Sequence, residues 1–198
     1  MLFSGTATAT TITSTFDTNL EGWTTNPQGT IAFVSTDGNP GGYLEETDAS
    51  STGNMHVTAP AKFLGDLTWA TNLSVDIRVS ATPGSVTAAF GTLTFLNSAA
   101  ALSVAVDLGT PSTVWTNYST ALNAAAFGVS AATYSAVMSN VTSITLILEA
   151  DRNSDTEKVG IDNFTIFGGT SVPEPSPFAL VAPVVLLGLV IRKAAVRA

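Results

Sequence analysis

Few residues in this sequence could perform catalysis. His56 is the only histidine and there is no cysteine, so the chain cannot form a thiol nucleophile or a cluster of imidazole and thiolate metal ligands. A Ser-His-Asp triad could use only His56, and no Gly-x-Ser-x-Gly turn surrounds a serine. We interpret residues 54–57 as the entry to a strand, with His56 at its surface.

Paired carboxylates are the other route to hydrolysis, because glycosidases place two of them roughly 5–10 Å apart. The chain has 15 acidic residues, so some pair will be close by chance and does not indicate an enzyme. We expect Glu45, Glu46 and Asp48 to form a solvated face. The sequence therefore predicts no enzyme, and a matrix polysaccharide hydrolase is the second of two alternative functions.

Aromatic side chains could instead provide an apolar platform for a sugar ring. Tyr43 and Trp69 lie beside turn residues, and they are the candidate glycan contacts. Trp23 and Trp115 are expected to pack in the core. A specific carbohydrate-binding, lectin-like module is therefore the first alternative function.

The acidic net charge of the chain excludes nucleic acid as a partner. The charged residues are also distributed unevenly between the body of the chain and its C-terminal end. Of 198 residues, 11% are charged, and the net charge is −8. Residues 1–170 hold four basic and fourteen acidic residues, whereas the remainder holds three basic and one acidic. Nucleic-acid binding needs a basic surface, which the acidic body does not offer. The mean hydropathy of +0.34 indicates a local apolar segment.

Short strands separated by turn residues must position these side chains. Residues 73–79 alternate strictly, with Leu73, Val75, Ile77 and Val79 on one face, as in a half-buried strand. Further strands are predicted at 30–35, 86–96, 102–108, 114–119, 141–148 and 159–167. Only residues 131–139 have helical spacing. This pattern favours an all-β antiparallel sandwich of the jelly-roll type.

Several motifs along about 150 residues resemble the laminin B (domain IV) module. They are 16–23 (FDTNLEGW), 39–44 (NPGGYL), 59–66 (APAKFLGD), 115–118 (WTNY) and 159–166 (VGIDNFTI), together with the stretch 137–148. The resemblance implies a galactose-binding-like jelly roll akin to carbohydrate-binding modules. It also implies an extracellular, non-catalytic, adhesive or structural setting.

The same resemblance implies a structural calcium ion between the first strand, the last strand and a nearby loop. By position, Asp17 and Asp162 match the two strands, and Asp37 lies in the loop. Calcium prefers six to eight oxygen ligands, which carboxylates and backbone carbonyls provide. Calcium is the only cofactor that the sequence suggests.

The C-terminal segment resembles a PEP-CTERM sorting signal. Pro173, Glu174 and Pro175 precede an uncharged apolar run at 177–191, and Arg192, Lys193 and Arg197 follow as a basic membrane stop. We expect a hydrophobic helix near 177–191 that anchors the chain transiently in the inner membrane. The resemblance implies that an exosortase-type membrane peptidase recognises the Pro-Glu-Pro motif and processes the chain.

The predicted organisation has three parts. Residues 1–12 are interpreted as the remnant of an export leader, 13–169 as the sandwich and 170–198 as the sorting signal. The chain is therefore expected to be exported, anchored in the inner membrane before processing, and then located at the cell surface or in the extracellular matrix. Its main predicted role is structural or adhesive within an exopolysaccharide layer, with the polysaccharide as a possible partner.

Overall fold

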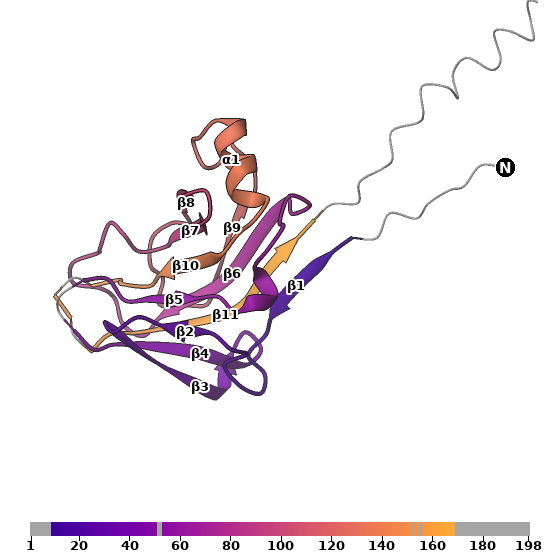
Figure 1. Cartoon of the computed structure of the whole chain (residues 1–198). Helices are drawn as coiled ribbons and strands as arrows, with labels where there is room; N and C mark the ends of the chain where they lie inside the picture. Colours follow the sequence, from indigo (N-terminus) through magenta and orange to yellow (C-terminus); the bar gives the residue numbers. More distant parts are fainter. Residues whose placement is uncertain (1–8, 51–52, 152, 155, 169–198) are drawn as a thin grey trace, which may run out of the picture. The chain divides into compact units, whose positions relative to one another are not determined.

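The computed structural model describes residues 9–50, 53–151, 153–154 and 156–168, which fold into an antiparallel sandwich of two sheets (Figure 1). Sheet A contains β1 (Thr11–Ser14), β3 (Gly29–Gly38), β4 (Gly41–Asp48), β6 (Asn72–Val79), β9 (Thr116–Ala121) and β11 (Lys158–Phe167). Sheet B contains β2 (Thr24–Thr25), β5 (His56–Thr58), β7 (Thr92–Asn97), β8 (Leu102–Asp107) and β10 (Ser143–Ile147). The prediction of an all-β antiparallel sandwich is confirmed.

Strand β11 is the centre of sheet A, whose order is β3-β4-β11-β6-β9. One edge of β11 pairs with β6 along its length, while the other pairs with β4 at its first half and with β1 at its second half. Strand β1 begins at Thr11, so the sandwich includes residues that we assigned to a leader remnant. Sheet B runs in the order β2-β5-β10-β7-β8.

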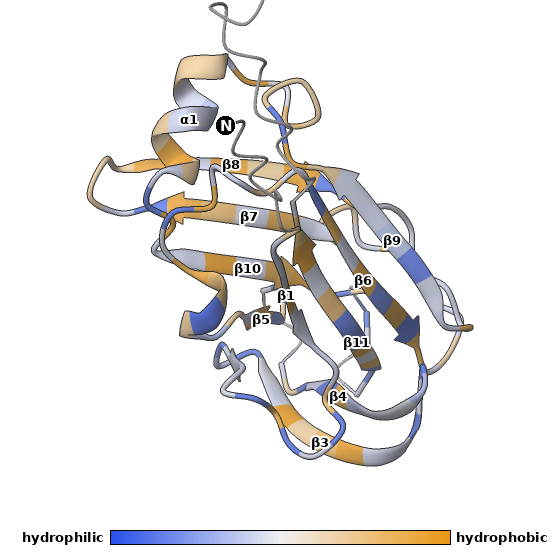
Figure 2. Ribbon diagram, turned by 90° about the vertical axis from the view of Figure 1, so that its right-hand side faces the viewer, coloured by the Kyte–Doolittle hydropathy of each residue, from blue (hydrophilic) through white to orange (hydrophobic). Residues whose placement is uncertain are grey.

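Alternating apolar residues close the core between the sheets, and β6 follows the predicted pattern. Leu73, Val75, Ile77 and Val79 are buried, and the alternation is visible as orange and blue bands along β6 in Figure 2. The facing side chains of sheet B include Leu93, Phe95, Ile144 and Leu146, which are also buried. Burial of such side chains is the main favourable contribution to folding.

The predicted helix is present, whereas one predicted strand begins later than expected. The helix is α1 (Ala131–Met138), as expected, and the hydroxyl of Ser130 caps it by accepting the amide of Thr133 at 3.1 Å. The strand predicted at 86–96 begins only at Thr92, because the preceding residues form a loop. The Asp151 carboxylate holds this loop by accepting the Gly84 amide at 2.6 Å.

One short 3₁₀ helix, η1 (Ala61–Phe63), completes the described elements. No helix in the part of the chain that the structure describes is long and apolar enough to cross a membrane. The predicted helix near 177–191, the motif Pro173–Pro175 and the basic stop lie outside the described residues.

Candidate functional site

A groove of about 260 Å³ opens on the outer face of sheet A, over β4, β11 and β6. Alternation along these strands directs apolar residues into the sandwich and leaves polar and aromatic side chains outside. The groove is lined by Asp37, Tyr43, Glu45, Arg78, Val79, Ser80, Thr113, Lys158 and Gly160. A second hollow of about 170 Å³ shares Val79, Ser80 and Lys158 with it, so the two hollows lie next to each other.

Gly160 leaves space on β11 for two aromatic rings. A Cβ atom at this position would lie 2.9 Å from ring atoms of both Tyr43 and Trp115. The two rings pack edge to face with their centroids 5.3 Å apart. The Arg78 guanidinium lies over both rings, 5.4 Å from the Tyr43 centroid and 4.7 Å from that of Trp115. These cation–π contacts hold the arginine in a fixed position beside the groove.

Two ion pairs border the groove. Arg78 pairs with the exposed carboxylate of Asp37 at 2.8 Å, and Lys158 pairs with Glu45. The hydrogen bond from Arg78 lowers the pKa of Asp37, and the nearby charge of Arg78 adds to this effect. The Tyr43 hydroxyl donates to Glu45 at 3.2 Å. The groove therefore offers aromatic contact next to charged hydrogen-bond donors and acceptors, as a hydroxyl-rich ligand requires.

The two candidate glycan contacts lie far apart. Tyr43 lines the groove with its ring next to Gly160, and only 6% of its surface is exposed. Trp69 is half-buried against Gly168, and its indole nitrogen donates to the Asp66 carbonyl at 2.9 Å. Eight residues of extended chain separate Gly160 from Gly168, which corresponds to about 25 Å. The structure therefore does not bring Tyr43 and Trp69 into one site.

The two other tryptophans have different environments. Trp23 is in the core as expected, 3% exposed, with its indole nitrogen bonded to the Ser14 hydroxyl at 2.9 Å. The core expectation for Trp115 is wrong, because this side chain is only partly buried and packs on the outer face of sheet A. Its position two residues before the outward-facing Asn117 is the signal that could have revealed this.

The three candidate calcium ligands do not form one set. Asp162 is fully buried, and its carboxylate accepts the amides of Asn39 at 2.6 Å and Asn163 at 2.7 Å. Burial, with smaller contributions from the Asp76 and Asp17 charges, raises the pKa of Asp162 to about 6. Asp17 is thus near Asp162, whereas Asp37 is paired with Arg78 beside the groove.

Within the described ranges, no group of three or more histidine, aspartate or glutamate side chains is arranged to hold a metal ion. Each carboxylate oxygen of Asp162 accepts one backbone amide, from Asn39 or Asn163. The described structure therefore does not gather Asp17, Asp37 and Asp162 into one ligand set, and a bound calcium ion stays a prediction.

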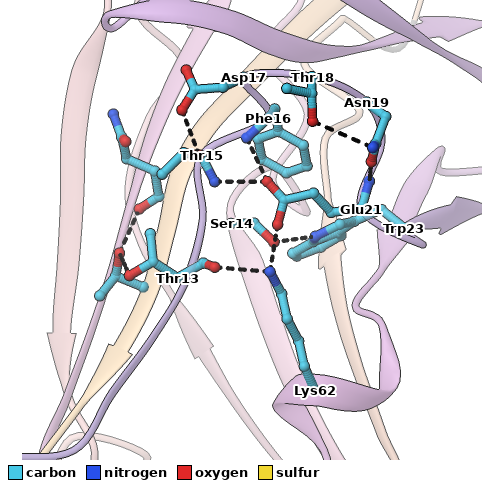
Figure 3. Close-up of polar contacts among 12 residues, drawn as sticks. Thr13, Ser14, Thr15, Phe16, Asp17, Thr18, Asn19, Glu21, Trp23 and Lys62 are labelled. Carbon is cyan, nitrogen blue, oxygen red and sulfur yellow. Dashed lines mark hydrogen bonds and ion pairs between the residues drawn. The ribbon is translucent and has the colours of Figure 1, made fainter.

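A polar network fixes the loop that carries Asp17 (Figure 3). The Glu21 carboxylate accepts the amides of Thr15 at 2.9 Å and Phe16 at 2.7 Å, and it also pairs with Lys62. The Lys62 ammonium donates in addition to the Thr13 carbonyl at 2.8 Å. These bonds connect the end of β1 to the η1 helix, so the loop is positioned by side chains on both sides.

The expected solvated face at Glu45, Glu46 and Asp48 is wrong for two of its members. Glu46 and Asp48 are 0% and 3% exposed because they share the inward side of β4 with Leu44. The charges of Asp48, of the buried Glu149 and of the partly buried Glu157 all act on Glu46, so the four carboxyl groups form one cluster. Glu46 Oε2 and Asp48 Oδ2 have no hydrogen-bond partner among the described residues.

Burial raises the pKa of Glu46 to about 7, against an opposing hydrogen bond from Thr25, and the Asp48 charge raises it further. The pKa of Glu157 is also raised to about 7, chiefly by burial.

His56 lies on β5 of sheet B, so the fold separates it from the groove on sheet A. Its side chain is half-buried, and burial lowers its pKa. The structure therefore does not bring His56 into the groove with Tyr43.

Comparison with known proteins identifies the fold. No protein-family model matches the sequence, and no curated protein matches it. A Clostridium thermocellum xylanase 10B structure containing CBM22-1 and GH10 modules, complexed with xylohexaose, matches with 17% identity and a TM-score of 0.52. The match covers 79% of this chain and 28% of the xylanase chain, so this chain spans less than a third of that protein.

Two separate carbohydrate-binding modules match over nearly their whole length. A CBM29-2 mutant complexed with mannohexaose is 14% identical with a TM-score of 0.53, over 86% of this chain and 99% of the module. The CBM22-1 xylan-binding domain from Paenibacillus barcinonensis Xyn10C is 9% identical with a TM-score of 0.52, over 81% and 95%. The described part of the chain therefore has an antiparallel sandwich fold similar to the jelly rolls of carbohydrate-binding modules.

Proposed function

We propose that the sandwich is a non-catalytic polysaccharide-binding module and that a glycan chain lies along the groove on sheet A. The observation that carries this proposal is the placement of Tyr43, Trp115 and Arg78 around Gly160, between two ion pairs. The partly exposed Trp115 ring, which packs against Tyr43 beside the groove, offers apolar surface to the C–H groups of a sugar. The carboxylates and cations beside them offer acceptors and donors for its hydroxyls.

The fold supports the same proposal. The similar structures include a module named as xylan-binding and modules crystallised with xylohexaose or mannohexaose. The groove and the hollow beside it share three lining residues, and an extended ligand could occupy both. We therefore favour a chain of several sugar units over a single monosaccharide.

The test measures retention of the full chain in native gels that contain soluble polysaccharides, including xylan and glucomannan. Trp115→Ala should weaken binding to the preferred polymer at least tenfold. Trp69→Ala is the matched control, because Trp69 lies at the other end of β11, and it should bind like the wild type. Glu45→Gln, a mild change in the groove, tests the site independently if the tryptophan variant does not fold.

Equal binding by all three variants, or no retention by any polymer, would remove the proposal. If only Trp69→Ala weakens polysaccharide binding strongly, the binding site lies at the opposite end of β11 and the proposed groove is not the site.

We also propose that the chain is exported, sorted by an exosortase-type peptidase and held in an exopolysaccharide layer, where it has a structural or adhesive role. The sequence Pro173-Glu174-Pro175, followed by the apolar run and Arg192, Lys193 and Arg197, supports this. Replacing the Pro-Glu-Pro residues with alanine should leave the uncut chain in the membrane fraction. Unchanged release, read by fractionation and mass spectrometry, would contradict it.

A further inference from the structure

Strand β3 is an open edge of sheet A. It pairs with β4 on one side only, and β3 is the first strand in the order of the sheet. Figures 1 and 2 show no described element along its other side. Its ten residues make it one of the two longest strands, so it presents a long row of backbone groups.

The hydrogen-bonding pattern shows which of these groups are free. The Ala49 amide donates to the Gln28 carbonyl at 2.8 Å, so Gln28 directs its backbone groups toward β4. Backbone direction alternates along an antiparallel strand, and even-numbered residues therefore face β4. The amides and carbonyls of Ile31 and Phe33 point to the open side.

The core is also incompletely covered at this edge. The strand of sheet B that lies near β3 is β2, which has only two residues. Ile31 and Phe33 point inward, as does their β4 neighbour Leu44, yet both remain partly exposed while Leu44 is fully buried. An additional strand beside β3 would cover these two apolar side chains.

Residues 29–34 of β3 lack the usual protection against edge pairing, because the register shift of this strand comes only after Val34. Natural edge strands carry lysines, prolines or inward-pointing charges that prevent another strand from adding. Residues 29–36 (GTIAFVST) contain no charge and no proline, although the whole chain has a net charge of −8. The first charge is Asp37, which follows the register shift after Val34. The regular part of β3 is therefore open to pairing.

We propose that β3 pairs with β3 of a second copy of this chain, antiparallel and with the two-fold axis at Ala32. In this register Ile31 pairs with Phe33 of the partner subunit. The backbone amides and carbonyls of both residues, which point to the open side of β3, then form hydrogen bonds in each copy. Ala32 lies opposite Ala32 of the partner subunit on the outer face, where its small, exposed side chain leaves room. The two sheets A then form one continuous sheet.

A second copy fits this edge better than an unrelated strand, because one register satisfies the same groups on both sides. The two copies of Asp37 lie ten residues apart along the paired strands, about 30 Å. This separation exceeds the Debye length of about 8 Å at physiological ionic strength, so the acidic charge does not prevent pairing.

Disulfide trapping in the full chain tests the register, since the protein has no cysteine of its own. Residues at Ala32 form a non-hydrogen-bonded pair with Cα atoms about 4.5 Å apart, which a disulfide can bridge. Ala32→Cys should form covalent dimers under mild oxidation at least tenfold faster than Thr30→Cys. The control residue lies on the same face of the same edge, but about 13 Å from its symmetry mate.

Sedimentation velocity over a concentration series tests the association without an introduced disulfide. Ala32→Lys should weaken self-association at least tenfold, because it places two cations at the two-fold axis. Thr47→Lys puts the same charge on the outer side of the inner strand β4 and should associate like the wild type. All variants contain residues 170–198, so this segment contributes equally to each of them. A difference in self-association between the variants therefore comes from the substituted position.

Equal cross-linking at residues 30 and 32, or a wild-type chain that is monomeric throughout, would overturn the proposal. Both measurements are made without polysaccharide, so their failure is distinguishable from failure of the glycan proposal.

Discussion

The indole nitrogen of Trp115 donates a hydrogen bond of 2.9 Å to the backbone carbonyl of Asp37, 78 residues earlier in the chain. This bond connects the entry of β9 to the end of β3. The same end of β3 presents the Asp37 carboxylate to Arg78, whose guanidinium lies over the Trp115 ring. One tryptophan therefore contacts both the end of β3 and the cation beside the groove.

Trp115→Phe should separate the hydrogen bond from the ring contact. Phenylalanine retains an aromatic ring against Tyr43 but cannot donate to Asp37. Loss of one such bond costs about 1 kcal/mol, so the free energy of unfolding should fall by about that amount in urea denaturation. An unfolding curve identical to that of the wild type would show that the Asp37 bond contributes nothing.

Gly160→Ala should disturb the groove without changing its polar groups. The added methyl would lie 2.9 Å from ring atoms of Tyr43 and Trp115, so both rings must move. Overpacking of this kind costs about 1–3 kcal/mol. Gly84→Ala is the matched control, because its nearest neighbour, an Asp151 oxygen at 3.4 Å, is at ordinary contact distance. Similar melting temperatures for the two variants would contradict the prediction.

The buried carboxyl cluster predicts that part of the stability decreases as pH rises. The pKa of Glu46 is about 7 in the folded protein, against an ordinary value of 4.5. The folded state therefore binds the proton more tightly, and this contribution is lost as pH rises from about 4.5 to about 7. Glu46→Gln should reduce this decrease and stabilise the protein at pH 8, as measured by urea denaturation across pH.

The control for this prediction is Glu45→Gln, on the opposite face of the same strand. It should keep the dependence of unfolding free energy on pH between 4.5 and 7. If Glu46→Gln shows the same pH dependence as the wild type, the Glu46 carboxyl is not the group that titrates.

Glu21 predicts a pH dependence of the opposite sign. Burial raises its pKa, but the hydrogen bonds from Lys62 and the Phe16 amide outweigh burial and leave the pKa below the ordinary value of 4.5. The stability from this carboxylate is present above pH 4.5 and is lost as pH falls through the lowered pKa. Glu21→Gln should therefore destabilise the protein at pH 7 but hardly at pH 2–3. Equal destabilisation at both values would exclude the charge as the cause.

The alternating strands could be predicted because apolar and polar residues alternate along the sequence in the same order as buried and exposed side chains. Residues 73–79 place every second side chain in the core, and β6 has the predicted faces. Strand β4 was missed because its sequence, GGYLEETD, begins with two glycines and contains three acidic residues. Its place beside β11 depends on pairing with a strand more than 100 residues later, which local patterns do not encode.

The groove was predictable only in part, for the same reason. Tyr43 was recognised as a candidate contact from the turn that precedes it. Trp115, Arg78 and Gly160 come from three different strands or their ends, and only the sheet order brings them together. The inward direction of Glu46 followed from its alternation with Glu45, but its acidic character favoured the surface.

The pairing of β1 with β11 has a mechanical consequence. Thr11, at the start of the first strand, is opposite Phe167, at the end of the last strand. A pulling force between these two points would load the Thr11–Phe167 end of the ladder first and peel β1 away one hydrogen bond at a time. The described sandwich should therefore resist tension applied between its own two ends poorly. A force transmitted from Phe167 to a polymer held on the outer face of sheet A would instead load β11 along its length, in shear.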